Sequence, residues 1–367
     1  MGNDRHFRKL PPVWFIKALN SLRYWLLLLN RRLFPASIVL YEHFQYFWLL
    51  PCLRVAAELD IAGMIKDRPM TILELAKETR TDPDYLFRIM RALSGNGIFK
   101  HRKDGKYSNS PMSKALIDGK SSLRYVIMQH LGSFNWQTFN ELGHSVRTGE
   151  NAVQKVWGKG IYDYLSENSE ESEIFDRSMT NLTELSIEPI LSVYDFSKFN
   201  RIADIGGGEG LLLSAILYKN PNVKGILFDL QEGLFRAESI LKKYNVKERT
   251  ETIQGNFFES SPVGAGIYLL KNILHNWSNE DCIRILKNIK NVLPDNGKIL
   301  IIEMVIEEDN KPSFGKLLDI QMMVFMNKGK ERTRKEYEAL LSMAGLQIDR
   351  IIPTISPLSV IEAIKLS

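Results

Sequence analysis

Cysteine is nearly absent from this sequence, which has only Cys52 and Cys282 in 367 residues. The two lie far apart and outside any metal-binding or redox motif, so we expect neither a disulfide framework nor a zinc site, and we expect a reducing cytoplasm. Uninterrupted apolar runs of about 18 residues are also absent, which argues against a membrane-spanning helix, and we expect no signal peptide. The formal net charge of +5 is small and dispersed, so it gives little support for nucleic acid as a partner.

The length and the balanced composition predict a globular protein of two domains. With 44% hydrophobic and 25% charged residues, the chain is close to the average for soluble proteins, and 367 residues exceed one typical domain. One segment departs from this balance, because residues 13–53 are rich in apolar and aromatic side chains, interrupted early by Lys17, Asn20 and Arg23. Such a surface needs a partner. Another subunit is the plainest candidate, and peripheral contact with a membrane is the alternative.

Helix signals follow one another closely in the first third of the chain. Residues 38–65 have the apolar pattern of a helix. Thr71 and Glu74 form a capping box for a short helix that follows. Asp82 and Pro83 supply the N-cap and the first turn of the next one.

A hairpin is predicted after these helices. Asp104 and Gly105 form a two-residue turn signal between the strand-like segments IFKHR and KYSNS. Two helices and a hairpin together predict a winged helix. Its second helix has only two basic residues, Arg88 and Arg91, among apolar ones. This helix therefore offers few side chains that could contact base edges in a DNA groove. We therefore expect residues 1–115 to be a mostly helical winged-helix dimerisation domain that does not bind nucleic acid.

From about residue 196, strand-like and helical segments alternate. The strand-like segments include RIADI, VKGILF, TETIQ, GIYLL and KILIIE, and two more, LQIDRIIP and SVIEAIKL, end the chain. This alternation predicts an open, mostly parallel sheet with helices on both faces, an α/β Rossmann-like fold. We assign it to residues 116–367.

A glycine loop, Gly206–Gly210, connects the first of these strands to a helix. Ligands of open α/β sheets bind at this edge, and glycines let the backbone approach them closely. The dinucleotide fingerprint fails here, because the frame that starts at Gly206 places Leu211 at its last glycine position. Asp229 ends the second strand, where an acid binds ribose hydroxyls. A ribose site without a pyrophosphate site suggests S-adenosylmethionine.

Further motifs identify a resemblance. One motif is the segment YLLKNILHNWSNEDCIRILKNIKNVLPDNGKILIIEMV. The others are ELGHSVRTGE, the glycine loop, FDL, GNFFE, NKGKERT and SPLSVIEA, and all of them occur in the order that is typical of one family. With the winged helix, this set resembles the small-molecule O-methyltransferases that include plant caffeate and flavonoid enzymes, animal acetylserotonin methyltransferase and bacterial enzymes of secondary metabolism. The resemblance covers nearly the whole chain. It implies a homodimer whose N-terminal helices intertwine.

The proton chemistry points to a histidine base. A phenol with a pKa of about 10 is a poor nucleophile at neutral pH, and a histidine with a pKa of about 6.5 can accept its proton as the methyl group moves. His275 follows the fourth predicted strand on the cofactor's side of the sheet. A carboxylate can orient such a base and stabilise its cation. Glu303 ends the strand KILIIE, and Glu331 lies in KGKERT; the resemblance places both beside His275 and implies no metal.

The resemblance also assigns residues to the cofactor and the acceptor. Gly206 and Gly208 would approach the methionine part of S-adenosylmethionine, and Asp229 its ribose. The residues assigned to the adenine are Asn256, Phe257 and Lys271. The resemblance further implies that two methionines, Met179 and Met322, clamp the acceptor ring, although methionines more often fill a core.

The sequence departs from the family pattern at three amides. Asn256, Asn276 and Asn279 stand where the family usually has aspartates in GDFF, HDW and DE. Asn256 can still accept a hydrogen bond from an adenine amino group, although a weaker one. Asn276 removes a negative charge next to His275, which predicts a weaker base. Methylation of carbon or nitrogen, non-methylating chemistry such as hydroxylation or cyclisation, and a winged-helix regulator that senses a metabolite remain alternatives.

Overall fold

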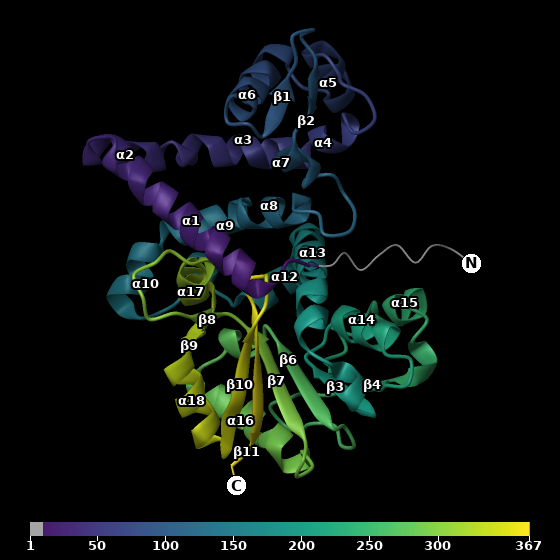
Figure 1. Cartoon of the computed structure of the whole chain (residues 1–367). Coiled ribbons are helices and arrows are strands. Elements are labelled where there is room, and N and C mark those ends of the chain that lie inside the picture. The colour runs from purple at the N-terminus through teal and green to yellow at the C-terminus, as the bar shows by residue number, and fades with distance from the viewer. Residues whose placement is uncertain (1–9, 367) are drawn as a thin grey trace. The chain divides into compact units, whose positions relative to one another are not determined.

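The computed structural model describes residues 10–366, which form two compact units. The helical unit comprises Trp25–Asn140 and Tyr162–Leu182. The sheet unit comprises Glu141–Ile161, the chain from Thr183 onward and the described residues up to Tyr24. Two long helices, α1 (Val13–Arg32) and α13 (Ser169–Val193), contribute residues to both units (Figure 1).

The helical unit contains the predicted order of helix, helix and hairpin. Its elements before α13 are α2 (Ala36–Phe44), α3 (Tyr46–Glu58), α4 (Ile61–Met64), α5 (Ile72–Thr79), α6 (Pro83–Gly95), β1 (Phe99–His101), β2 (Tyr107–Asn109), α7 (Pro111–Lys114), α8 (Arg124–His130), α9 (Ser133–Asn140) and most of α12 (Ile161–Glu167). The capping box at Thr71 and the N-cap at Asp82 form as predicted. Strands β1 and β2 pair antiparallel across the predicted turn.

The single helix predicted over residues 38–65 is wrong in its continuity. The structure divides this stretch into α2, α3 and α4, with interruptions at Gln45 and at Asp60. Asp60 adopts a left-handed conformation with a φ of 51°, which ends a helix and which Asp tolerates better than most residues. The apolar periodicity continues through the interruptions and therefore does not mark them.

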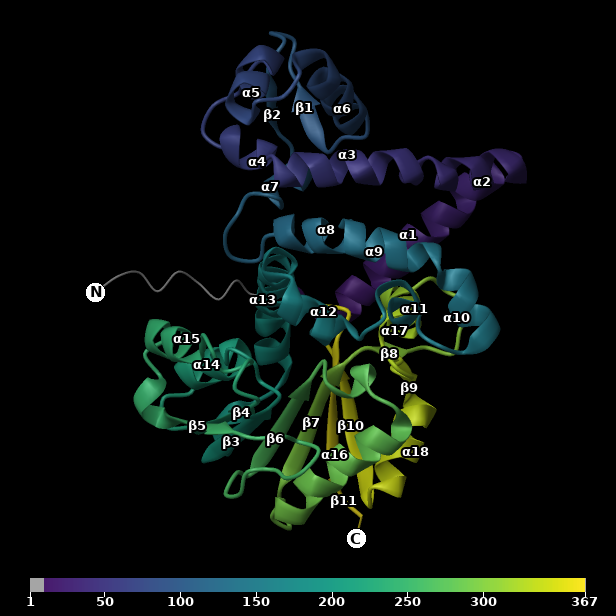
Figure 2. The same cartoon turned by 180° about the vertical axis from the view of Figure 1, so that it is seen from behind.

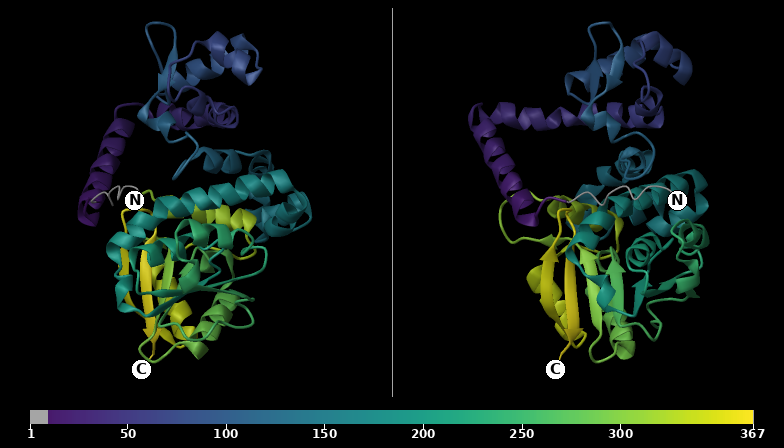
Figure 3. Two further views of the ribbon diagram at one scale, coloured as in Figure 1. Left: turned by 90° about the vertical axis from the view of Figure 1, so that its right-hand side faces the viewer. Right: turned by 45° about the vertical axis from the view of Figure 1, so that its right-hand side comes forward.

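The sheet unit is built on a seven-stranded sheet in the order β10-β11-β7-β6-β3-β4-β5. Its strands are β3 (Arg201–Ile205), β4 (Lys224–Asp229), β5 (Thr250–Gln254), β6 (Ile267–Lys271), β7 (Lys298–Glu303), β10 (Leu346–Pro353) and β11 (Ser359–Lys365). The first five run parallel, and β11 pairs antiparallel with both β7 and β10. Strands β10 and β11 lie side by side at one edge (Figure 3). The predicted mostly parallel sheet is confirmed.

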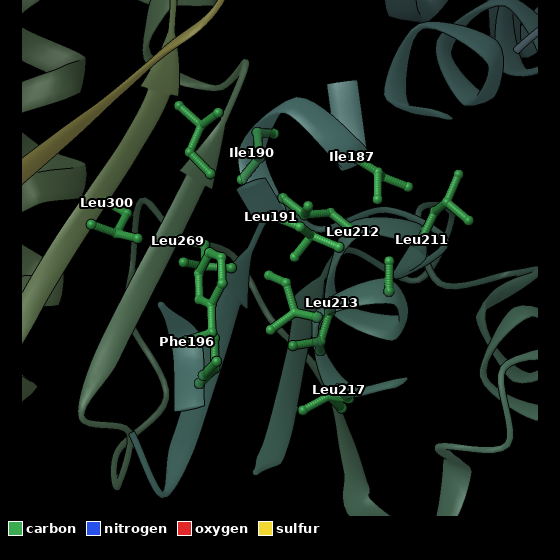
Figure 4. Packing of buried hydrophobic residues seen from close by; sticks show 14 of the residues in the cluster. Ile187, Ile190, Leu191, Phe196, Leu211, Leu212, Leu213, Leu217, Leu269 and Leu300 are labelled. Atoms are coloured by element: carbon green, nitrogen blue, oxygen red, sulfur yellow. The ribbon is translucent and has the colours of Figure 1, made fainter. Parts of the chain in front are cut away.

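Helices cover both faces of this sheet. The helices that lie wholly within the unit are α10 (Leu142–Thr148), α11 (Ala152–Trp157), α14 (Leu211–Lys219), α15 (Ala237–Lys243), α16 (Asn279–Val292), α17 (Phe314–Phe325) and α18 (Arg334–Met343). One apolar core joins the sheet to α14, α15 and the end of α13 (Figure 4). The other core joins it to α16 and α18, which lie in front of the strands in Figure 2.

Consecutive residues of a strand contribute alternately to the two cores. Ile202 of β3 belongs to the core under α14, and its neighbour Ala203 belongs to the core under α16. Leu269 and Tyr268 of β6 divide in the same way. Side chains at consecutive strand positions point to opposite faces, so strands buried on both faces appear as continuous apolar runs. Because these strands run parallel, their carboxyl ends meet at one edge of the sheet, and the candidate site lies at that edge.

Candidate active site

The glycine loop turns the chain between β3 and α14 at the carboxyl edge of the sheet. Gly206, Gly208 and Gly210 all have positive φ angles, of 67°, 56° and 76°. A Cβ atom at Gly206 would lie 2.6 Å from Cδ1 of Ile273, so no side chain fits there without a shift. A Cβ at Gly208 would meet no atom within 4 Å. The loop therefore presents bare backbone toward open space at Gly208.

Asp229, at the end of the neighbouring strand β4, is bonded to this loop. Its Oδ2 accepts a hydrogen bond of 2.7 Å from the backbone N–H of Gly208, and its Oδ1 accepts one of 2.7 Å from the N–H of Leu230. Burial raises the pKa of Asp229, although the two N–H groups act against that change. A carboxylate has about four acceptor positions, so two of them remain for hydroxyl groups of a ligand.

Asn256 and Phe257 follow the next strand, β5. Oδ1 of Asn256 accepts a hydrogen bond of 2.9 Å from the N–H of Phe258, and its Nδ2 lies 3.3 Å from Oε1 of Glu259. The ring of Phe257 comes close to the glycine loop, because its Cε1 would lie 3.5 Å from a Cβ at Gly206. An aromatic ring thus borders the loop.

Lys271 ends β6, on the other side of β3. Its Nζ donates a hydrogen bond of 3.1 Å to Oγ1 of Thr183. Burial lowers the pKa of Lys271 to about 8, and the charge of Asp204 acts against this change. Burial also raises the pKa of Asp204, on β3, to about 7. These two titratable groups lie beneath the loop and near the middle of the edge.

His275 lies on a 3-10 turn, η3 (Leu274–Asn276), four residues after Lys271. Its Nδ1 is 2.7 Å from Oε1 of Glu331, and since a carboxylate can only accept, Nδ1 bears the proton in this pair. Burial opposes the charged ring, but the hydrogen bond to Glu331 and the charge of Glu303 outweigh it and raise the pKa of His275. The second ring nitrogen, Nε2, is therefore the one that can act as a base.

The two predicted carboxylates contact different parts of His275. Glu331 bonds the ring, whereas Oε1 of Glu303 accepts a hydrogen bond of 3.2 Å from the backbone N–H of His275. The other oxygen of Glu303 accepts one of 2.6 Å from the hydroxyl of Tyr337. The backbone N–H of Glu331 donates to Oδ1 of Asp319 over 2.9 Å. Both glutamates are buried.

Comparison with known proteins identifies the chain. The family model for the O-methyltransferase domain matches residues 139–347, and the model for the O-methyltransferase dimerisation domain matches residues 41–119. The chain belongs to the O-methyltransferase family. It is 34% identical to a phenazine O-methyltransferase of Lysobacter antibioticus over 90% of this chain and 96% of the relative.

Two further relatives of this O-methyltransferase differ in the atom named as acceptor. An 8-amino-8-demethylriboflavin N,N-dimethyltransferase of Streptomyces davaonensis is 32% identical over 84% of this chain and 90% of its own. The neocarzinostatin-biosynthesis O-methyltransferase NcsB1, solved with S-adenosylmethionine and 2-hydroxy-5-methyl naphthoic acid, is 30% identical with a TM-score of 0.73, covering 86% of this chain and 96% of that one.

The methionines predicted at the acceptor lie in different units. Met322 is a buried residue of α17 in the sheet unit, and its carbonyl accepts the N–H of Met326. Met179 is a partly buried residue of α13 in the helical unit. Their pairing across an acceptor ring stays a prediction.

The three amides each have a hydrogen bond in the O-methyltransferase. Asn256 closes its own turn, and Nδ2 of Asn276 donates over 3.1 Å to the carbonyl of Asn272. Oδ1 of Asn279 accepts from the guanidinium of Arg332, at 3.1 and 3.3 Å. The amides are therefore built into the turns around the site.

Sequence reasoning missed Arg332, which holds the turn that positions His275. Its guanidinium is fully buried and donates hydrogen bonds of 2.9 Å to the carbonyls of Leu274 and of Trp277, which flank the catalytic candidate. The adjacency of Arg332 to Glu331 in KGKERT was a signal for it. Nothing in the sequence marks Asp319 or Tyr337, because each meets its glutamate only in the folded protein.

Proposed function

We propose that this O-methyltransferase transfers a methyl group from S-adenosylmethionine to a hydroxyl of a small aromatic or polyketide-like metabolite, with His275 as general base and without a metal. The observation behind the proposal is the contact between Nδ1 of His275 and Oε1 of Glu331, beside the glycine loop. In the described residues 10–366, no three His, Cys, Asp or Glu residues are grouped so that they could hold a metal ion.

The residues at the sheet edge fit S-adenosylmethionine, which when bound supplies an electrophilic methyl group on a sulfonium. Bare backbone at Gly206 and Gly208 allows a close approach of the methionine part, and the free acceptor positions of Asp229 suit ribose hydroxyls. We assign the adenine to Asn256 and Phe257. Lys271, with its lowered pKa, completes the set near the adenine as a donor.

His275 can remove the proton of the acceptor hydroxyl through Nε2. Glu331 fixes the tautomer by accepting a hydrogen bond from the Nδ1–H group, and its negative charge stabilises the imidazolium that forms. A raised pKa also narrows the difference from a phenol, whose pKa is about 10. Glu303 acts on the backbone of the same residue and keeps the turn in place. We assign Met322 and Met179 to the acceptor ring, because thioethers make favourable contacts with aromatic rings.

N-methylation is the second candidate function. The riboflavin-related relative is named as an N,N-dimethyltransferase, and its 32% identity to this chain is close to the 34% of the phenazine O-methyltransferase. A neutral arylamine has a free electron pair and needs no base before attack. Dependence on His275 therefore distinguishes the two acceptor classes.

We further propose a homodimer in the cytoplasm, with no role for nucleic acid. The match to the dimerisation domain over residues 41–119 supports the dimer, and the two free thiols, Cys52 and Cys282, support a reducing compartment. The boundary between a dimerisation domain, 1–115, and a methyltransferase domain, 116–367, stays a proposal as well.

A methyl-transfer assay with labelled S-adenosylmethionine tests the function. A panel of paired phenols and arylamines is offered to the wild type, to His275→Ala and to the matched control His101→Ala, an exposed histidine of the hairpin. We expect His275→Ala to lower kcat for phenols by about 10²- to 10⁴-fold, with S-adenosylmethionine affinity unchanged and no effect of a chelator. Unchanged phenol turnover would remove His275 from the mechanism.

The same assay separates the alternatives. Turnover of amines alone, insensitive to His275→Ala, would establish the N-methylating function instead. Mass spectrometry of the product decides whether a methyl group has been transferred at all. An unmethylated, modified product would point to non-methylating chemistry.

A further inference from the structure

Helix α1 has an apolar face that faces solvent. None of its residues, all within the described part of the chain, is buried. Phe15, Leu19, Leu22, Leu26 and Leu29 recur at intervals of four and three residues, which places them on one side of the helix. Leu22 and Leu26 are 51% and 49% exposed. A contiguous exposed apolar surface of this kind, which we call the apolar stripe, marks a site of interaction with a protein or a membrane.

Two tryptophans widen the stripe. Trp14 and Trp25 are 70% and 57% exposed and lie next to the leucines on the helix surface. Val13, Tyr24 and Leu28, which are less exposed, lie on the opposite side of the helix. A stripe of this width exceeds the narrow seam of a coiled coil, and tryptophan is typical of helices that lie in a membrane interface.

Charge separates this segment from the rest of the chain. Residues 1–35 contain seven Lys or Arg residues and one Asp, a formal charge of +6, while the whole chain has +5, so residues 36–367 are close to neutral. Within α1 the charged residues are Lys17, Arg23, Arg31 and Arg32, and there is no acid. Arg23 and Arg32 follow the two edges of the apolar stripe. Cations at the edges of an apolar face match anionic lipid headgroups.

A second copy of the chain is a poorer partner for α1 than an anionic lipid surface. The family model for dimerisation matches residues 41–119 and therefore begins after α1 has ended. Packing α1 against its copy would also bring cations against cations without any acid to pair with them. The helix is not a membrane span either, because no described helix is long and apolar enough to cross a bilayer.

We propose that α1 lies on the surface of an anionic lipid bilayer, with its apolar stripe in the interface and its cations among the headgroups. The helix would thereby hold the enzyme at a membrane. Methyl transfer does not depend on this contact, so the proposal stands apart from the assigned function.

Vesicle sedimentation with the full chain tests the proposal. Vesicles of phosphatidylcholine alone are compared with vesicles containing phosphatidylcholine and phosphatidylglycerol in about equal amounts. We expect binding to the anionic vesicles only, weakened by salt. The variant Leu22→Glu/Leu26→Glu should lose this binding. The control Tyr218→Glu/Val263→Glu replaces two exposed apolar residues of the sheet unit, which are 58% and 70% exposed, and should bind as the wild type does.

A charge variant gives a graded readout that does not disturb the stripe. Each Lys or Arg at an anionic surface contributes about fivefold to partitioning, so Arg23→Gln/Arg32→Gln should weaken binding about 25-fold. Light scattering without lipid should show the same oligomeric state for every variant. Absence of wild-type binding to anionic vesicles, or equal binding by Leu22→Glu/Leu26→Glu, Arg23→Gln/Arg32→Gln and the wild type, overturns the proposal. Loss of the wild-type oligomer in Leu22→Glu/Leu26→Glu, without vesicle binding by the wild type, would show instead that a second copy covers α1.

Discussion

Replacement of Arg332 by methionine should destabilise the protein and slow catalysis through His275. The guanidinium donates to the carbonyls of Leu274 and Trp277 at 2.9 Å each, and it is fully buried. The carbonyl of Leu274 also accepts the N–H of Trp277, so it keeps a partner when Arg332 is lost. The carbonyl of Trp277 keeps only a weak contact of 3.6 Å from Sγ of Cys282.

These contacts set the expected magnitude. A buried carbonyl without a partner costs about 1–3 kcal/mol, and a lost hydrogen bond to a charged donor costs about 1.5–3 kcal/mol. Removal of a buried charge offsets part of this cost. We therefore expect Arg332→Met to lose about 3 kcal/mol of unfolding free energy. Arg332→Lys, which keeps the charge but not the fork of donors, should lose about half of that.

The activity of this variant should fall more than its stability alone explains. A misplacement of a catalytic group by about 1 Å can cost about 10²-fold, so kcat should drop by that order while KM for S-adenosylmethionine stays near the wild-type value. Urea denaturation and steady-state kinetics measure the two effects. The control Arg334→Met removes an exposed guanidinium paired with Glu338 and should cost less than about 0.5 kcal/mol. Equal effects of the two variants, or a stable Arg332→Met with unchanged kcat, would refute the reasoning.

Two further predictions concern the base and the loop. In Glu331→Gln the pKa of His275 should fall because the charged partner is lost. Since the base must be neutral to act, the acidic limb of the pH profile of kcat/KM should move to lower pH, and the plateau should drop. An acidic limb that stays at the wild-type pH would contradict this prediction. Gly208→Ala and the control Gly149→Ala introduce the same left-handed strain, with φ angles of 56° and 75° and open space at each Cβ. Both should lose about 1–2 kcal/mol of stability, but calorimetry should find weaker S-adenosylmethionine binding, by about tenfold or more, only for Gly208→Ala.

The sheet was predictable because its signals are local. An apolar strand followed by an amphipathic helix repeats along the chain, and the right-handed crossover rule leaves few arrangements. Caps at Thr71 and Asp82 are also decided within four residues and were confirmed. The interruption at Asp60 could not be predicted, because a left-handed residue inside an apolar pattern leaves no periodic trace.

The site was predictable only as far as strand order brings strand ends together. His275 follows β6 and Glu303 ends the neighbouring strand β7, so their proximity follows from a parallel sheet. Glu331 reaches the same edge through a short strand, β9 (Arg332–Thr333), paired with β8 (Val305–Ile306) directly after β7. That pairing involves only two residues on each side, which is too short for a pattern to reveal. The contact of Glu331 with the ring was therefore available from the resemblance and not from periodicity.

The two buried glutamates contact different parts of His275, one the ring and the other the backbone, and this difference gives each a separate role. A single carboxylate on Nδ1 would fix the tautomer but would leave the turn free to rotate away from the sheet edge. Glu303 restrains that turn by its bond to the backbone N–H, and Tyr337 in turn holds Glu303. Arg332 closes the other side by binding the carbonyls that flank the turn. The ring is thus oriented by one acid while its backbone is held from both directions, and in the proposed mechanism its Nε2 would accept the proton with little reorganisation.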